Sequence, residues 1–437
     1  MCADDPSIRG MPVGQCCWSG RCKRDDKGEV IKDNARCCHR GDLDKRICPV
    51  DPNASTSPVV RNQSSNILDA NGVLCDQSTC SWDVPGAYLQ GVQTEAERKV
   101  LRPPAGFRKW DERGIEILWS MNVSLYGGPT SGAIWNRTYD EIATKPAGSA
   151  EKPVIGYERS YNDPCVYSKC TAQGDRINSS LYVDDGRYYF NQSAKAEAQR
   201  DLDFLEERFG VKPNAFDQPK DYFLGANRTS YDRSSVKIHA TTYIESMGKR
   251  YLRKPLEEYP AAWAYTPADD TLVRAFESAC TARLPAAKDL SDRYYSLHGA
   301  VMYTTKFRGE IGAAMGMCGT CLTFPTEGLF DCLEHILVYL LRTKSLGVTY
   351  SAHAPNPKLH AEADSNWSIT RSTSGFVIFL AGGAVSTTSR RQHCISMSST
   401  EAELIALAEC AIELLHVIAL LEFIDRLRVR RSCQSAY

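Results

Sequence analysis

Two adjacent carboxylates, Asp184 and Asp185, have the clearest capacity for chemistry in this sequence. They follow the apolar run Leu181-Tyr182-Val183 and precede Gly186, which is typical of a β-hairpin that presents its acids at the turn. Adjacent ionised carboxylates repel each other unless a divalent cation or a proton compensates them. Mg²⁺ prefers oxygen ligands, and two such ions can hold both oxygens of a phosphoryl transfer. The ordinary alternative is a polar hairpin tip without chemistry.

A third acid upstream favours the chemical interpretation. Asp83 ends a strand-like run, and Pro85-Gly86 forces a bend directly after it, with Tyr88 just beyond. An acid at the end of a strand can reach a cleft. Together the three aspartates predict a site that holds magnesium.

Length and composition set the broad class. A chain of 437 residues is expected to form two or three domains. A net charge of −1 gives no whole-chain signature of nucleic-acid binding, so any basic face must be local. The 18 cysteines have irregular spacing in a long chain, which favours reduced thiols and an intracellular protein, cytoplasmic or nuclear. The apolar runs at 376–385 and 404–424 are too short or interrupted by charge, so no transmembrane helix is expected.

Cations cluster near the beginning of the chain, at Lys23, Arg24, Lys32, Arg36 and Arg40. Asp26-Lys27-Gly28 between β-compatible flanks predicts a hairpin within this cluster. Such a cluster can hold a triphosphate or a template backbone through charge and bidentate guanidinium contacts. A solvated hairpin is the alternative interpretation.

The remaining patterns are mainly structural. Residues 193–209 predict a helix that Ser193 caps and Pro213 ends. Cys318 and Cys321 have the spacing of a zinc or redox pair, but no second pair lies near them, which favours core packing.

The last part of the chain predicts a separate unit. Residues 348–352 and 375–380 are strand-like, and Gly382-Gly383 predicts a hairpin turn. Ser398 and Glu401 then open a long helix with a capping pattern. The buried face of this helix is expected to consist of Leu404, Leu407, Ala411, Leu414, Leu415, Ile418 and Leu421.

The order of these motifs resembles the reverse transcriptase of Ty1/copia-type retrotransposons. The motifs are residues 83–91, 103–107, 125–127, 182–185 and 222–225. Residues 294–303 are similar to that family's connecting segment, and residues 336–350 are similar to its lead-in to ribonuclease H. Residues 371–376 and 399–403 are similar to its ribonuclease H. The resemblance covers nearly the whole chain, as a fragment of the element's Pol polyprotein.

The resemblance implies an α+β fold of the right-hand polymerase type. Fingers and palm would occupy residues 1–230, and thumb and connection residues 231–345. A C-terminally truncated ribonuclease H-like α/β domain would occupy residues 346–437. The implied activity is RNA-directed DNA polymerisation with Mg²⁺ or Mn²⁺, using an RNA template, a DNA primer and deoxynucleoside triphosphates.

Site residues follow from the same resemblance. Asp83, Asp184 and Asp185 match the catalytic, metal-binding aspartates of the polymerase. Lys23, Arg36, Arg40, Tyr88 and Tyr182 are candidates for nucleotide or template contacts, with Tyr88 as an aromatic gate against the ribose 2′-hydroxyl. The primer grip matches Phe223-Leu224-Gly225. In the ribonuclease H-like part, Asp364 and Glu403 match metal ligands, with Glu362 as an alternative first acid.

Several departures from the family pattern bear on activity. The segment 34–41 lacks one expected cation, and 128–132 lacks a lysine and a glutamine. Apolar residues usually follow the two aspartates, whereas this chain has Gly186-Arg187. Arg187 either pairs with Asp184 or Asp185 and competes with metal, or points to solvent. A non-catalytic nucleic-acid-binding remnant and a misfolded relic therefore stay open beside a reverse transcriptase with little or no ribonuclease H activity.

Overall fold

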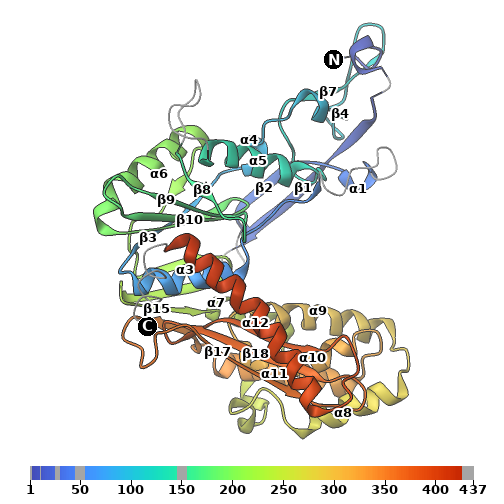
Figure 1. Ribbon diagram of the computed structural model, residues 1–437. Helices are drawn as coiled ribbons and strands as arrows, with labels where there is room; N and C mark the ends of the chain where they lie inside the picture. The colour runs from blue at the N-terminus through green and yellow to red at the C-terminus, as the bar shows by residue number, and fades with distance from the viewer. Residues whose placement is uncertain (1, 10, 25–29, 45–54, 145–154, 426–437) are drawn as a thin grey trace.

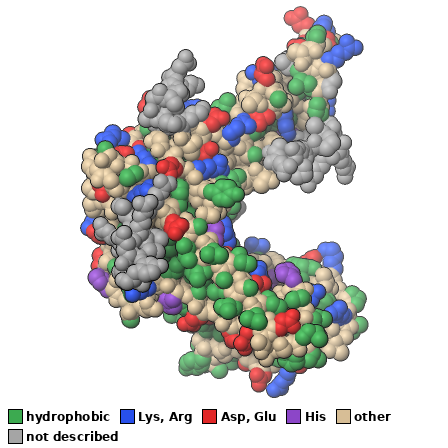
Figure 2. All heavy atoms as spheres, in the orientation of Figure 1, with side chains coloured by type: hydrophobic (Ala, Val, Ile, Leu, Met, Phe, Trp, Pro, Cys, Tyr) green, Lys and Arg blue, Asp and Glu red, His purple; other side chains and the backbone are tan. Residues whose placement is uncertain are grey.

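The structure is a computed structural model that describes residues 2–9, 11–24, 30–44, 55–144 and 155–425. The described residues form an upper and a lower body with a wide hollow between them, and Figure 2 shows this hollow in profile. The first half of the chain builds most of the upper body (Figure 1). The second half builds the lower body, and its last helix crosses the near side of the molecule.

The upper body is built on a six-stranded sheet. Its strands are β3 (Ser78–Asp83), β8 (Glu158–Arg159), β9 (Val166–Cys170), β10 (Arg176–Tyr182), β11 (Asp185–Phe190) and β12 (Lys212–Pro213). They lie in the order β12-β3-β11-β10-β9-β8. Trp82 and Tyr188 pack on one face, against α5 (Ser131–Thr144) and α6 (Lys195–Phe209). Tyr189 packs on the other face, with α3 (Asn62–Leu74), because side chains alternate along a strand.

The helix predicted at 193–209 is present, but its ends differ from the prediction. It begins with a 3-10 turn (Gln192–Ala194) and continues as α6, and the Ser193 side chain does not cap it. It ends at Gly210, which has a φ of 64°, rather than at Pro213. Glycine in the left-handed region terminates a helix without steric strain, so it stops α6 before the proline is reached.

A second sheet extends from the upper body. It contains β1 (Val13–Arg24), β2 (Val30–His39), β4 (Lys99–Arg102) and β7 (Trp119–Met121), in the order β2-β1-β4-β7. β1 and β2 pair antiparallel, as the sequence predicts, while the turn at 25–29 lies outside the described residues. β1 and β4 pair parallel. Short elements flank this sheet: α1 (Gly41–Asp44), α4 (Ala87–Gln90), β5 (Lys109–Trp110) and β6 (Glu116–Ile117).

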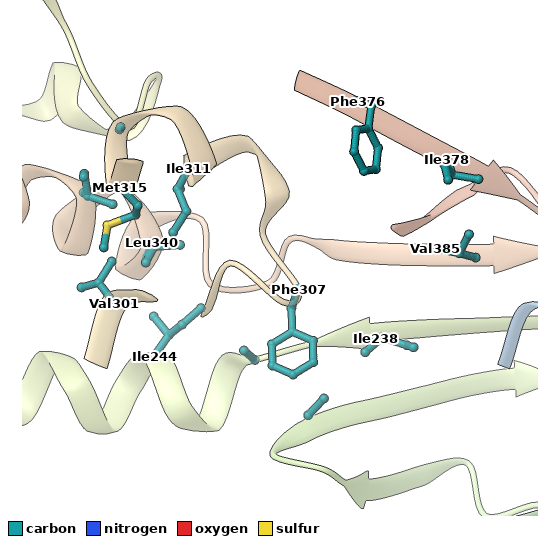
Figure 3. Packing of buried hydrophobic residues seen from close by; sticks show 14 of the residues in the cluster. Ile238, Ile244, Val301, Phe307, Ile311, Met315, Leu340, Phe376, Ile378 and Val385 are labelled. Atoms are coloured by element: carbon teal, nitrogen blue, oxygen red, sulfur yellow. The ribbon is translucent and has the colours of Figure 1, made fainter. Parts of the chain in front are cut away.

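The lower body contains a four-stranded sheet and a set of helices. The strands are β13 (Lys220–Phe223), β14 (Ala226–Asp232), β15 (Ser235–His239) and β16 (Gly347–Ser351). The helices are α7 (Thr241–Tyr251), α8 (Asp270–Ala282), α9 (Lys288–Thr304), α10 (Gly312–Thr320) and α11 (Glu327–Arg342). Figure 3 shows their apolar side chains converging, with Ile244, Val301, Ile311 and Leu340 turned toward one another.

Two sequence predictions can be compared with the structure in this region. Cys318 and Cys321 are both fully buried in the hydrophobic core, as core packing requires. The strand at 347–351 was expected to belong to the C-terminal unit, but β16 pairs with β15 along its whole length. Its hydrogen bonds therefore tie the chain to the lower sheet before the last unit begins.

The last unit is a three-stranded antiparallel sheet covered by one helix. The strands β17 (His360–Asn366), β18 (Thr373–Leu380) and β19 (Gly383–Arg391) lie in sequence order. Side chains of Ser398 and Glu401 cap the beginning of the helix α12 (Ser399–Ile424). The Ser398 hydroxyl accepts the Glu401 N–H at 3.1 Å, and the Glu401 carboxylate accepts the Met397 N–H at 2.6 Å.

The predicted buried face of α12 is wrong at most positions, although Leu414 and Leu421 pack, partly buried, against the core. Its fully buried residues are Ala402, Ala406, Cys410, Val417, Leu420 and Ile424. Leu404, Leu407 and Leu415 are 61%, 58% and 66% exposed, and Figure 2 shows hydrophobic side chains gathered on the near face over this helix. Both sides of α12 are apolar, so periodicity alone does not choose between them. The small side chains Ala402 and Ala406 lie on the side that meets the sheet.

α12 is also long and apolar enough to cross a membrane by length and composition alone. Its most apolar 18-residue window has a mean hydropathy of 2.2, although no membrane-spanning helix was expected from the sequence. One such helix is weak support for a membrane span, because core helices of soluble proteins meet the same criterion. Only 22% of the window is buried here.

The two sides of α12 should respond differently to the same truncation. Leu420→Ala should lower the free energy of unfolding by about 2–5 kcal/mol, because it opens a cavity in the hydrophobic core. Leu415→Ala is the matched control on the exposed side and should change it by less than about 0.5 kcal/mol. Chemical denaturation measures both, and equal losses would contradict the assigned face.

Candidate active site

The adjacent aspartates lie where β10 turns into β11. Tyr182 pairs with Asp185, so Val183 and Asp184 form the two-residue turn, and Asp185 is the first residue of β11. Val183 has a φ of 57°, an unusual conformation for a β-branched residue. The indole N–H of Trp135 donates to the Val183 carbonyl at 2.6 Å and holds this strained turn in place.

Asp83 lies beside this turn on the neighbouring strand. It is the last residue of β3 and the cross-strand partner of Asp185. The backbone N–H of Val84 donates to the carbonyl of Asp184 at 2.8 Å, which ties the end of β3 to the turn itself. The structure thus brings Asp83, Asp184 and Asp185 onto adjoining backbone.

A glycine is required directly after the aspartates. The indole ring of Trp82 packs across Gly186, its cross-strand partner. A Cβ at Gly186 would lie 2.1 Å from that ring, so any larger residue would push β11 away from β3. Gly186 therefore allows the two acid-bearing strands to approach each other closely.

Burial and neighbouring negative charge raise the pKa values of Asp83 and Asp185. Burial raises the pKa of Asp185 to about 6, and the charges of Asp184 and Asp83 add to the shift. Burial and Asp184 also raise the pKa of Asp83, while Lys212 opposes the shift. Within the described ranges no three His, Cys, Asp or Glu side chains form a ready-made metal cage. The carboxylates nevertheless suit a divalent cation, because they leave negative charge uncompensated.

Aromatic and cationic groups adjoin the carboxylates. Tyr88, in α4, packs edge-on against Tyr126 with ring centroids 5.4 Å apart. Burial and the charge of Asp184 raise the pKa of Tyr88, which places this phenol near the acids. The Arg36 guanidinium lies 4.8 Å from the centre of the Tyr126 ring. Sequence reasoning gave Tyr126 no role, although its place in the motif 125–127 was an available signal.

The other predicted cations differ in position. Arg40 forms an ion pair with Asp42 at 2.7 Å, so its charge is already compensated within the chain. The local spacing of these two residues makes that pairing easy. The backbone of Lys23 belongs to β1 and pairs with Lys32. The Lys23 side chain lies outside what the structure describes.

The turn at 223–225 lies near the same place. Leu224 and Gly225 have φ values of 53° and 77°, which correspond to a type I′ turn between β13 and β14. The Tyr303 hydroxyl, on α9, donates to the Leu224 carbonyl at 3.1 Å, and a Cβ at Gly225 would lie 1.9 Å from that hydroxyl. Burial raises the pKa of Tyr303, with contributions from the neighbouring phenols, Tyr182 among them. Tyr182 is 38% exposed, so it reaches the surface beside this turn.

Neither alternative weighed for Arg187 is correct. Its side chain is 3% exposed and forms an ion pair with Asp221, the second residue of β13. It therefore neither pairs with Asp184 or Asp185 nor reaches solvent. The partner lies 34 residues away along the chain, which is why local sequence reasoning missed it.

The candidate acids of the C-terminal unit are exposed. Glu362 and Asp364 lie on one side of the edge strand β17, and Glu403 lies near the beginning of α12. They belong to elements that pack together, but no three metal-binding side chains gather here among the residues that the structure describes. The structure does not distinguish Glu362 from Asp364.

Comparisons with known proteins agree with the family that the sequence motifs indicate. The family described as reverse transcriptase (RNA-dependent DNA polymerase) matches residues 5–251. The Pol polyprotein of transposon TNT 1-94 from Nicotiana tabacum is 25% identical over 93% of this chain. An uncharacterised mitochondrial protein of Arabidopsis thaliana is 36% identical over 54% of this chain and 91% of its own length. The resemblance to copia-type Pol polyproteins is thus confirmed.

The match to the polyproteins is partial. This chain spans less than a third of the transposon relatives, 29% of TNT 1-94 and 26% of two Arabidopsis thaliana polyproteins. A foamy viral protease-reverse transcriptase, solved in complex with double-stranded DNA, aligns over 95% of this chain and 59% of its own. Its sequence identity is 12% and its TM-score 0.45, a similarity too low to place any residue.

The raised pKa of Asp185 predicts how pH changes stability without metal. Because the folded pKa, about 6, exceeds the ordinary 3.8, the contribution of this group is complete below about pH 4 and is lost as pH rises through 6. The melting temperature should therefore fall between about pH 4 and pH 6. The loss in the free energy of unfolding should be about 1 kcal/mol, because solvent screens the partly exposed carboxylate. Added Mg²⁺ should restore stability above pH 6 but not at pH 5. Asp185→Asn should abolish both effects, whereas Asp203→Asn, on the exposed side of α6, should leave both intact.

Proposed function

Because the chain belongs to the family of reverse transcriptases (RNA-dependent DNA polymerases), we propose that it extends a DNA primer on an RNA template. The observation that carries the proposal is the adjacency of Asp83, Asp184 and Asp185. Three adjoining carboxylates, of which Asp83 and Asp185 have pKa values raised by burial and by neighbouring negative charge, suit nucleotidyl transfer, which depends on positioning and charge neutralisation.

These aspartates would hold Mg²⁺, or Mn²⁺ in its place. When bound, two such ions supply the positive charge that aligns a primer 3′-hydroxyl and stabilises charge on the α-phosphate. The chain itself contributes rigid placement. Three contacts fix the backbone that carries the acids: the packing of Trp82 on Gly186, the hydrogen bond from Trp135, and the pairing of β3 with β11.

The nucleotide is proposed to bind between Arg36 and the carboxylates. Arg36 is exposed and stacked on Tyr126, so its guanidinium is oriented while its N–H groups stay available for a triphosphate. Tyr88 packs against the same ring and lies near Asp184. A phenol in this position would lie under the sugar of the nucleotide and exclude a 2′-hydroxyl by steric repulsion.

Primer and template are proposed to occupy the hollow between the two bodies. The turn 223–225, held by Tyr303 and adjoining Tyr182, supports contact with the primer. Arg40 and Lys23 would contribute to the template side of the hollow, Arg40 only where its pairing with Asp42 is released.

The C-terminal unit is proposed to bind the hybrid without cutting it. Asp364 and Glu403 provide two acids for a reaction that needs a complete two-metal cage. We therefore expect the RNA strand of a labelled hybrid to survive incubation with the enzyme and Mg²⁺.

Primer extension tests the proposal directly. Wild-type protein should extend a DNA primer on RNA with Mg²⁺ or Mn²⁺, slowly because a cation is missing from the segment 34–41. Asp184→Asn should reduce extension at least about a hundredfold, since one carboxylate of the set is lost. Asp364→Asn is the control and should leave extension unchanged. Tight hybrid binding without extension would instead indicate a non-catalytic binding protein.

The role of Tyr88 has its own test. Tyr88→Val should raise ribonucleotide relative to deoxynucleotide incorporation at least about tenfold, because the ring that collides with the 2′-hydroxyl is gone. Tyr88→Phe keeps the ring and should keep the discrimination. If Tyr88 were only a core residue, Tyr88→Val would lower stability by about 2–4 kcal/mol and depress both substrates alike.

A further inference from the structure

One face of the central sheet continues from the carboxylates into a buried ionic network. Asp185 pairs with Asp83, Arg187 with Ser81, and Tyr189 with Thr79. Residues two apart on a strand point to the same face. Arg187 therefore lies one step along the face that carries Asp83 and Asp185.

The contacts of Arg187 join three strands. Its guanidinium donates to Asp221 on β13, and it donates to the Thr79 hydroxyl on β3 at 3.1 Å. The Ser81 hydroxyl, also on β3, donates to the same Asp221 carboxylate at 2.9 Å. β3 and β11 both carry catalytic acids, so this cluster fixes β13 directly to them.

A second buried arginine continues the network to the turn. Arg228, on β14, donates to Asp69 at 2.9 Å and to the carbonyl of Phe223 at 2.6 Å. Asp69 also accepts the Tyr189 hydroxyl at 2.9 Å, and its carboxylate lies 3.6 Å from the Arg187 guanidinium. The turn 223–225 is thus connected to β11 from both of its strands.

The network is better suited to fixing geometry than to adding stability. Arg187, Asp69 and Arg228 are each 2–3% exposed. Charges removed from water lose about as much hydration energy as they regain from pairing, so a well-packed apolar pair is often equally stable. A bidentate or forked guanidinium contact, in contrast, sets distance and orientation.

We propose that Arg187 is a positioning residue, which through Asp221 sets where the turn 223–225 lies relative to Asp83 and Asp185. The inference rests on the proposed function, since that turn is where a primer would be held. Loss of the pair would leave primer binding nearly intact and misplace the 3′-hydroxyl, and small misplacements of a reacting group greatly reduce its rate.

Replacing Arg187 and Asp221 together separates an effect on the position of the turn 223–225 from an effect on the stability of the fold. Arg187→Met alone leaves a buried Asp221 without its partner and should lower the melting temperature. The double variant Arg187→Met with Asp221→Asn removes both charges, keeps an acceptor for the Ser81 hydroxyl and should recover it. In that double variant the single-turnover extension rate should stay about tenfold or more below wild type, with the primer–template Kd changed less than about threefold. Extension at the wild-type rate would overturn the proposal.

A matched control and a second measurement complete the design. Arg233 and Asp76 form an exposed ion pair at 2.9 Å near the same strands. Asp76 has a φ of 49°, which asparagine tolerates, so Arg233→Met with Asp76→Asn should change neither rate nor stability. Hydrogen exchange at residues 222–226 should be faster in the Arg187 double variant than in wild type, while α11 stays unchanged. Inactive wild-type protein would count against the proposed function, whereas unaltered exchange at this turn would count against the role of Arg187.

Discussion

The mutual repulsion of three carboxylates is the constraint on which the rest of the molecule depends. Asp83, Asp184 and Asp185 are held on adjoining backbone although their charges oppose this arrangement. Only a stiff framework keeps them together without a cation. The antiparallel β3–β11 pair provides it, with Trp82 packed across Gly186 and Trp135 bound to the strained turn. The aromatic core under α5 and α6 supports the same strands from the opposite face.

Local patterns were the part of the structure that sequence could predict. The hairpin at the aspartates, the β1–β2 pair and the serine N-cap of α12 each depend on residues a few positions apart. The partner of Arg187 was missed because Asp221 lies on a different hairpin, and nothing local marks it. The pairing of β16 with β15 was missed for the same reason, since it joins segments about a hundred residues apart.

The long C-terminal helix shows a different limit. Periodicity assigns a buried face only when one side of a helix is polar, and α12 is apolar on both sides. The sheet selects the side with Ala402 and Ala406, which leaves Leu404, Leu407 and Leu415 facing outward. A helix with two apolar sides is normally covered on both of them. The outward side of α12, with Leu404, Leu407 and Leu415, is therefore an unusually apolar surface for the described residues.

The ion pair between Arg187 and Asp221 also limits how the sequence can change. A copy that returned to the usual apolar residue at position 187 would first leave the Asp221 carboxylate without its counter-charge, which is more harmful than keeping both charges. A change at Asp221 alone would likewise leave the buried Arg187 guanidinium without this carboxylate. The two positions are therefore epistatic, and drift away from this pair has to pass through a less fit intermediate.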